Sequence, residues 1–103
     1  MDTVDERATS EILQAPSGRF EDGTPLQAVE YGQLTLTLHC PRAYPPGKPL
    51  SLQVELDEAV ALVGRCIGSK LQPEGHYQVR MRLTNLSRPT RLALEGRLGK
   101  PGA

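Results

Sequence analysis

The chain is poor in aromatic residues, and it contains no long apolar run. Its 103 residues include three tyrosines, one phenylalanine and no tryptophan. Proteins that bind nucleic acid on a β-sheet normally stack bases on aromatic side chains, so this scarcity argues against that function. No apolar stretch approaches the roughly 18 residues that a membrane helix needs. The start of the chain, with Asp2, Asp5 and Glu6, is the reverse of the basic start of a secretory signal. We therefore expect a cytoplasmic domain without membrane insertion.

Cysteine and histidine are also scarce, which limits disulfide and metal chemistry. The two cysteines, Cys40 and Cys66, form no Cys-x-x-Cys pair. Without an export signal we expect both to be reduced and semi-buried, since free cysteine behaves as a small hydrophobic residue. His39 directly precedes Cys40, and neighbours on a strand point to opposite faces, so these two side chains cannot bind one metal. His76 lies at a turn and is interpreted as a surface histidine. No metal site is expected.

The sequence contains none of the short motifs that mark common catalytic sites. It has no nucleophile elbow, no His-Glu-x-x-His motif, no phosphate-binding loop and no dinucleotide fingerprint. Its adjacent acids, Glu21-Asp22 and Asp57-Glu58, fall at expected turns, where carboxylates are ordinarily solvated. We expect no catalytic residues, no cofactor and a function that depends on binding.

Charge is balanced over the whole chain but unevenly distributed along it. Residues 1–31 carry seven acids against two arginines, a net charge of −5. Residues 59–103 carry eight basic residues against two acids, a net charge of +6. Such regions can attract each other or face different partners, and two separately solvated faces are an equally consistent interpretation.

Four segments alternate apolar and polar residues with the period of two that is typical of half-buried strands. They are residues 33–39, 50–56, 59–68 and 77–83. The expected core consists of the apolar residues on their inward faces: Leu34, Leu36, Leu38, Leu50, Leu52, Val54, Leu56, Val60, Leu62, Val79, Met81 and Leu83. Three or four antiparallel strands with short connections must close to hide their edges, so we expect a small barrel or sandwich.

The prolines and the last apolar segment define the remaining organisation. Four prolines and a glycine among residues 41–49 exclude a helix and a central strand, and they predict a rigid loop. Residues 87–98 fit a helix by the spacing of Leu94 and Leu98, or a strand by the alternation of Leu92 and Leu94. Ser87 as an N-cap favours a short helix. We divide the chain into an N-terminal arm (1–18), a barrel domain with a C-terminal helix (19–98) and a flexible tail (99–103).

The candidate binding surface is a group of arginines on the outer side of the expected sheet. Arg80 and Arg82 are two residues apart on one strand, so their side chains leave the same face, and Arg65 can lie beside them. Arg91 extends the basic region into the last segment. Guanidinium groups on one face repel one another unless an anionic surface covers them. We expect an acidic cover, either a protein partner or residues 1–11 of this chain; the alternative is a solvated basic face.

From about residue 27 to residue 98 the order of features resembles the PilZ domain, a small adaptor of bacterial cyclic di-GMP signalling. The shared features are a strand that reaches Gly32, a Pro46-Gly47 loop, two long hairpin strands and a helix-like end. The matching stretches are residues 31–36, 46–52, 60–66, 77–83 and 91–95. The resemblance implies an all-β fold, a small antiparallel β-barrel with a short C-terminal helix.

The motifs that hold the nucleotide in that family are altered here. Its nucleotide-binding members carry Arg-x-x-x-Arg before the barrel and Asp/Asn-x-Ser-x-x-Gly on an early strand. The first motif aligns with Arg7 and Glu11, and the second reads Gln27, Val29 and Gly32 at its three defining positions. Hydrogen bonds to charged groups contribute roughly 1.5–3 kcal/mol each, so losing three or four could remove most of the ~8 kcal/mol of a micromolar complex. Glu11 would also repel a phosphate.

The resemblance therefore implies a degenerate member that binds a protein partner in motility, pilus or related regulation, without cyclic di-GMP. One alternative is a divergent receptor that still binds cyclic di-GMP through other residues. A second is an unrelated small barrel with affinity for nucleic acid. The oligomeric state stays open, a homodimer included.

Overall fold

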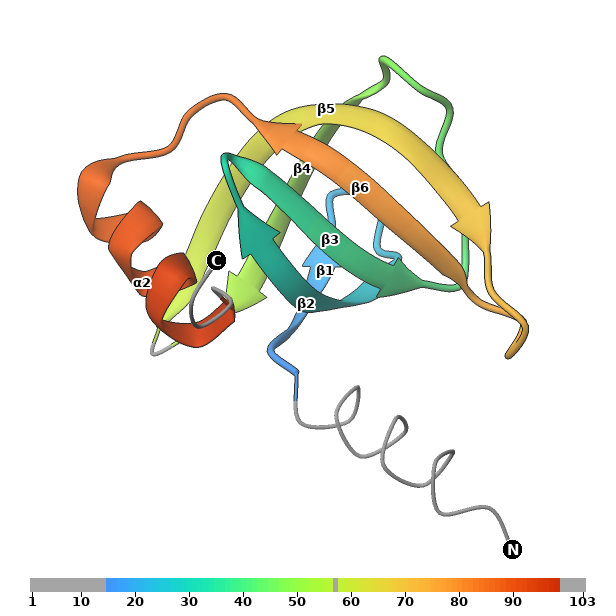
Figure 1. The fold of residues 1–103 in the computed structure, drawn as a ribbon, viewed down its shortest axis with the longest axis horizontal. Coiled ribbons are helices and arrows are strands. Elements are labelled where there is room, and N and C mark those ends of the chain that lie inside the picture. Colours follow the sequence, from blue (N-terminus) through green and yellow to red (C-terminus); the bar gives the residue numbers. More distant parts are fainter. Residues whose placement is uncertain (1–14, 57, 99–103) are drawn as a thin grey trace, which may run out of the picture.

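Six antiparallel strands form a closed barrel, with one helix at its end (Figure 1). The computed structural model describes residues 15–56 and 58–98. Around the barrel the strands follow the order β1-β2-β3-β6-β5-β4. The elements are β1 (Ser17–Phe20), β2 (Pro25–Gly32), β3 (Thr35–Cys40), β4 (Pro49–Glu55), β5 (Ala59–Leu71), β6 (Tyr77–Leu83) and α2 (Arg88–Leu98). The expected fold, an all-β antiparallel barrel with a short C-terminal helix, is confirmed.

The four strands expected from alternation are β3 to β6. Alternation predicts neither β1 nor β2, although the PilZ resemblance implies a strand that reaches Gly32, where β2 ends. β6 has the expected bounds, and β5 continues to Leu71, three residues beyond the expected end. β2 carries an irregularity in its pairing with β3 between Ala28 and Glu30, which interrupts its period of two. β1 begins at Ser17, so the barrel includes two residues of the expected arm 1–18.

A tight turn joins β2 to β3 and corrects one expected core residue. Gly32 pairs with Thr35, so Gln33 and Leu34 alone form the loop. Both have positive φ, 51° for Gln33 and 64° for Leu34, as a two-residue hairpin turn of the primed type requires. Leu34 therefore belongs to the turn and is only half-buried, whereas alternation placed it in the core.

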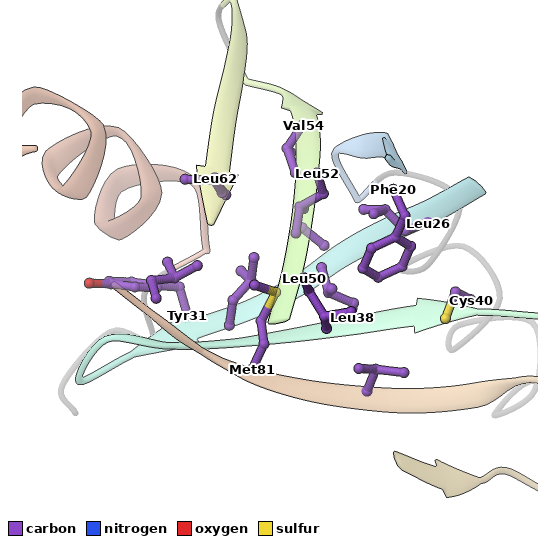
Figure 2. Packing of buried hydrophobic residues seen from close by; sticks show 14 of the residues in the cluster. Phe20, Leu26, Tyr31, Leu38, Cys40, Leu50, Leu52, Val54, Leu62 and Met81 are labelled. Atoms are coloured by element: carbon purple, nitrogen blue, oxygen red, sulfur yellow. The ribbon is translucent and has the colours of Figure 1, made fainter. Parts of the chain in front are cut away.

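Inward side chains of all six strands fill the barrel (Figure 2). Nine of the twelve expected core residues are buried, and Leu56 and Val60 pack against them partly exposed. Cys40 and Cys66, which were expected to be semi-buried, are buried. The buried apolar residues outside the expected set come from β1, β2, the proline-rich loop and α2: Phe20, Leu26, Ala28, Tyr31, Tyr44, Leu94 and Leu98. Because side chains occupy the interior, a ligand must bind on the outside of the barrel.

Residues 88–98 form a helix, so of the helix and the strand considered for the last segment the helix is correct. The Ser87 hydroxyl accepts a hydrogen bond from the Thr90 backbone N–H (3.4 Å), so Ser87 acts as the expected N-cap. Leu94 and Leu98 are the buried residues of α2, which packs against β2. In Figure 1 the helix lies at one end of the barrel. Within residues 15–56 and 58–98, no helix has the length and apolar character needed to cross a membrane.

Candidate functional site

Four neighbouring strands, β2, β3, β6 and β5, place polar side chains in rows across the outer face of the barrel. The pairing registers define the central row, in which Glu30 faces Thr37, Thr37 faces Arg80 and Arg80 faces Gly68. A second row runs from Gln27 through His39 and Gln78 to Lys70, and a third from Gly32 through Thr35 and Arg82 to Arg65. Residues far apart in the sequence are therefore direct neighbours on this face.

An open groove of about 710 Å³ follows this face. Its lining is mainly polar and comes from all four strands and the β2–β3 turn: Glu30, Gly32, Gln33, Thr35, Thr37, Ile67, Gly68, Ser69, Lys70, Gln78 and Arg80. Thr37 is only 7% exposed, although it points outward, because long side chains flank it on β2 and β6. Pairing irregularities in β2 and β5 border the groove on both sides, and such bulges bend a sheet.

The groove and its margin are basic. Lys70 and Arg80 line it, and Glu30 is the acid among the lining residues. Arg65 and Arg82 are direct cross-strand partners at the margin, and both are exposed. Like charges in directly opposed positions destabilise a sheet. This surface therefore carries an electrostatic cost that an anionic ligand would remove.

The structure brings together three of the four arginines that the sequence proposed for binding. Arg80 lies in the groove, and Arg65 and Arg82 lie in the neighbouring row. The Arg65 guanidinium also donates a hydrogen bond to the Gly47 carbonyl oxygen (3.1 Å). Arg91 instead lies on α2, near Tyr31: burial raises the pKa of the Tyr31 hydroxyl, and Arg91 acts in the opposite direction. Arg91 is outside the rows of the sheet.

The three β2 positions at which the sequence is compared with a nucleotide-binding motif do not come together in the groove. Gly32 lines the groove, whereas Gln27 lies beside His39 in a separate hollow and Val29 occupies the irregular position of β2. Arg7 and Glu11, the positions of the other motif, lie outside the described residues, as does the acidic segment 1–11. Within the described chain, the motif supplies only backbone at Gly32 to the groove.

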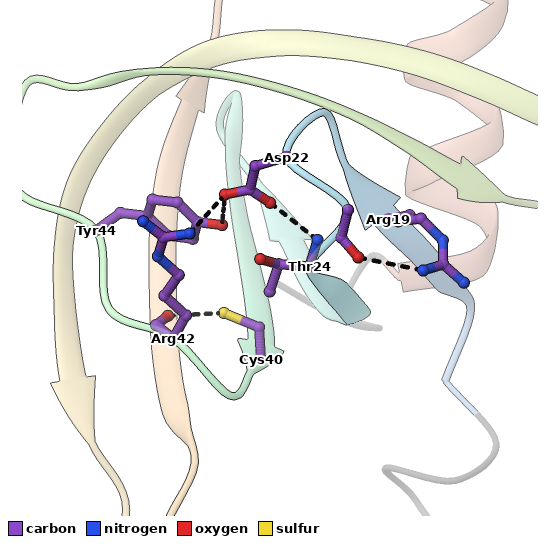
Figure 3. A network of polar contacts seen from close by, with 7 residues as sticks. Arg19, Asp22, Thr24, Cys40, Arg42 and Tyr44 are labelled. Atoms are coloured by element: carbon purple, nitrogen blue, oxygen red, sulfur yellow. Dashed lines mark hydrogen bonds and ion pairs between the residues drawn. The ribbon is translucent and has the colours of Figure 1, made fainter.

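A second hollow, of about 430 Å³, lies against the proline-rich loop, and two of its charged side chains, Asp22 and Arg42, are paired with each other. The Asp22 carboxylate accepts hydrogen bonds from the Thr24 N–H (2.8 Å), the Tyr44 hydroxyl (2.9 Å) and the Arg42 guanidinium (3.1 Å) (Figure 3). These bonds, Thr24 foremost, lower the pKa of Asp22. Tyr44 also stacks obliquely on Phe20 at 4.8 Å between ring centroids. This network holds the proline-rich loop against the β1–β2 turn.

The cysteines and histidines differ in how far they match expectation. Cys40 and Cys66 are free and buried, and burial raises the pKa of both thiols. Their Sγ atoms donate to backbone carbonyls of the proline-rich loop, those of Arg42 and Tyr44. His76 lies at a turn as expected and its side chain is 24% exposed, but its ring also contacts His39, which was not expected. Among the described residues no three metal-ligating side chains come together.

Sequence reasoning did not predict that Thr37, Lys70 and Gln78 come together as the polar lining of the groove. Alternation placed Gln78 and Arg80 on the outer face, but the pairing of β3 with β6 joins residues about 40 positions apart. A pattern within a few neighbouring residues cannot predict which residue of β3 pairs with which residue of β6. Searches against family profiles, curated proteins and solved structures return no match for this chain.

Proposed function

We propose that this chain is a PilZ-like adaptor module that binds an acidic protein segment along the outer groove and needs no cyclic di-GMP. The observation that carries the proposal is the exposed basic face formed by Arg65, Arg80 and Arg82 beside a polar groove. The closed barrel with a C-terminal helix has the architecture that the PilZ resemblance implies. Such a domain would serve bacterial regulation of motility, pili or a related process by protein–protein contact.

The spacing of the charges favours an extended segment as the ligand. Along β6, Arg80 and Arg82 are two residues apart, a separation of roughly 6.8 Å in a strand. An extended chain repeats its side chains on one side at the same interval. A segment with an acid at every second position can therefore place its carboxylates against consecutive arginines, while its backbone follows the groove. Arginine pairs with carboxylates in two-point geometry, which adds specificity to the attraction.

The burial of the aromatic side chains argues against the nucleic-acid alternative. Phe20, Tyr31 and Tyr44 are 3–4% exposed, and Tyr77 is half-buried. These are all the aromatic side chains of the chain. Single-stranded nucleic acids bind to exposed aromatic rings, so the outer face lacks the stacking platform that this function uses.

A labelled peptide of alternating glutamate and serine tests the proposal directly. Fluorescence anisotropy should show saturable binding that weakens as salt rises, because the contact is between exposed charges. Arg80→Glu with Arg82→Glu should weaken binding at least about tenfold, equivalent to about 1.4 kcal/mol. The matched control, Arg19→Glu with Arg88→Glu, reverses two exposed arginines elsewhere and should retain the affinity. Equal loss in both double variants would show only a long-range charge effect and would contradict the groove as the site.

Two further titrations separate the alternatives. Calorimetry with cyclic di-GMP at tens of micromolar should give no saturable heat; a low-micromolar constant would establish the divergent receptor instead. Salt-dependent retention of generic single-stranded DNA, lost in the Arg80→Glu, Arg82→Glu variant, would establish the nucleic-acid barrel.

The acidic segment 1–11 of the chain itself is the remaining candidate cover. Asp2, Asp5, Glu6 and Glu11 can be changed together to their amides in the full chain. If this segment competes for the basic face, the variant binds the glutamate–serine peptide more tightly than the wild type. Equal affinity would exclude the segment as a competitor.

A further inference from the structure

The two histidines of the chain form a hydrogen-bonded pair that joins β3 to the turn before β6. His76 Nε2 lies 2.8 Å from His39 Nδ1, and the ring centroids are 4.5 Å apart. His39 belongs to β3, and His76 belongs to the turn of residues 72–76 between β5 and β6. A hydrogen bond between two imidazole nitrogens needs one N–H and one lone pair. The contact therefore holds when at most one of the two rings is charged, and it is lost when both are.

The surroundings of this pair favour the uncharged form of His39. Burial is the main cause that lowers the pKa of His39, His76 acts in the same direction, and Glu74 opposes them. The Glu74 carboxylate lies 3.9 Å from His76 Nε2 and is 63% exposed, so water weakens its effect. Two cations stand nearby: Arg19 lines the same hollow as His39, and Lys70 lies in the same row of the sheet. From β2 and β6 the register neighbours of His39 are uncharged, Gln27 and Gln78.

Hydrogen bonds connect the histidine pair to the end of the groove. The Gln72 N–H donates to the His76 carbonyl oxygen (2.8 Å), which ties the two ends of the turn together. The Gln72 side-chain amide donates to the Gln78 side-chain oxygen and to the Lys70 carbonyl oxygen, both at 3.3 Å. Gln78 and Lys70 line the groove. The position of the turn thus sets the position of two groove residues.

We propose that the histidine pair is a pH-dependent clasp that fixes the turn of residues 72–76 to β3 and opens when both imidazoles carry a proton. In the closed clasp, His76 holds the turn, and Gln72 holds Gln78 and Lys70 at the groove. In the open clasp, two adjacent positive rings repel each other, and the turn separates from β3. Mild acid therefore loosens the end of the groove while the rest of the barrel stays closed. The consequence for peptide binding rests on the proposed function; the opening itself does not.

The sign of the effect follows from the lowered pKa of His39. Because the folded chain takes up a proton at His39 less readily than the unfolded chain, the closed clasp is favoured above the ordinary histidine pKa of 6.5. Its contribution to stability declines as the pH falls from about 6.5 through the lowered pKa of His39. Glu74→Gln removes the carboxylate that raises the pKa of His39, so it should move the opening to lower pH.

Nuclear magnetic resonance on the full chain without any ligand tests the clasp, since two histidines give a simple ring spectrum. The measurement is amide-exchange protection in residues 72–76, corrected for the intrinsic effect of pH. Between pH 7.5 and pH 5, protection of the turn should be lost in the wild type and stay constant in β4, because the His39 pKa is lowered by burial. His76→Gln keeps a polar side chain without a titratable ring, and its protection in the turn should not change with pH.

A turn protected equally at both pH values, or a pH effect that persists in His76→Gln, would overturn the clasp. If His76→Gln does not fold, the direction of the Glu74→Gln shift decides the question in its place: opening at lower pH supports the clasp, and an unmoved transition contradicts it. Failure of the glutamate–serine peptide to bind, with an opening turn, would contradict only the proposed function.

Discussion

Gln33 is an exposed residue held in a left-handed backbone conformation, with φ of 51°. This conformation costs a residue with a Cβ about 1 kcal/mol, whereas glycine adopts it freely. Gln33→Gly should therefore raise the free energy of unfolding by about 0.5 kcal/mol, after allowing for the greater freedom that glycine gives the unfolded chain. Urea denaturation of the full chain measures the change.

The same substitution in a strand should have the opposite sign. Gln53 is also exposed, but it lies in β4, paired with Ala61 on one side and Arg19 on the other. Gln53→Gly should lower the free energy of unfolding by about 0.5–1 kcal/mol, because glycine is entropically unfavourable within a strand. Two changes of the same sign would show that side-chain contacts, and not the backbone conformation, determine the effect at Gln33.

At the scale of elements, α2 is attached to the barrel through a single apolar side. Leu94 is fully buried and packs with the core, whereas Leu92, two residues earlier, is 54% exposed. Leu94→Ala should cost about 2–5 kcal/mol, because it removes buried methyl groups and leaves a cavity at the end of the barrel. Leu92→Ala is the matched control and should cost about 0.5 kcal/mol or less.

Thermal unfolding followed by circular dichroism compares the two variants. A Leu92→Ala variant as unstable as Leu94→Ala would mean that the helix packs through a different side from the one described. The comparison also tests the choice of helix over strand for residues 87–98, since in a strand Leu92 and Leu94 would share one face.

Strands of regular alternation could be predicted from the sequence, and strands with interruptions could not. β6 alternates without a break from Tyr77 to Leu83 and was predicted with its bounds. Alternation missed β2, which only the family resemblance implied, because the pairing of β2 shifts between Ala28 and Glu30 and interrupts the period of two. Leu34 was assigned to the core because alternation cannot distinguish a strand from the turn that precedes it.

The candidate site brings together residues that are far apart in the sequence, and local sequence patterns do not predict such contacts. Arg80 and Arg82 could be placed on one face from their spacing alone, and their approach to Arg65 was predicted correctly. The contact between His39 and His76 spans 37 positions. It requires both the register of β3 against β6 and the shape of the turn before β6. Turn geometry and register emerge only when the barrel closes.

At the scale of the whole molecule, the barrel places its features at separate locations. α2 covers one end of the barrel, and the β5–β6 turn lies at the other (Figure 1). The residues that line the groove come from β2, β3, β5, β6 and the β2–β3 turn. A closed barrel has no free sheet edge along its paired strands, so strand addition by a partner is disfavoured and side chains must provide the contacts. That argument supports recognition by charge on the outer face.

Closure of the barrel depends on a short seam, where β1 pairs with β4 through three residue pairs, Gly18 with Val54, Arg19 with Gln53 and Phe20 with Leu52. Gly18 lies so close to β4 that a Cβ there would overlap the Gln53 carbonyl oxygen, and Val54 also stands against it. These are backbone atoms, which cannot rotate away. Gly18→Ala should therefore separate β1 from β4 and cost about 1–3 kcal/mol, the usual range for overpacking.

Gly68→Ala is the control for the seam, because a Cβ at Gly68 would meet no atom within 4 Å. This variant should be as stable as the wild type or slightly more stable, since alanine is preferred to glycine within a strand. Amide exchange then distinguishes local from global effects: Gly18→Ala should expose β1 and β4 first and leave the long β5–β6 pair protected. If protection instead fell equally in all six strands, the β1–β4 seam would be part of one cooperative unit rather than the point at which the barrel opens.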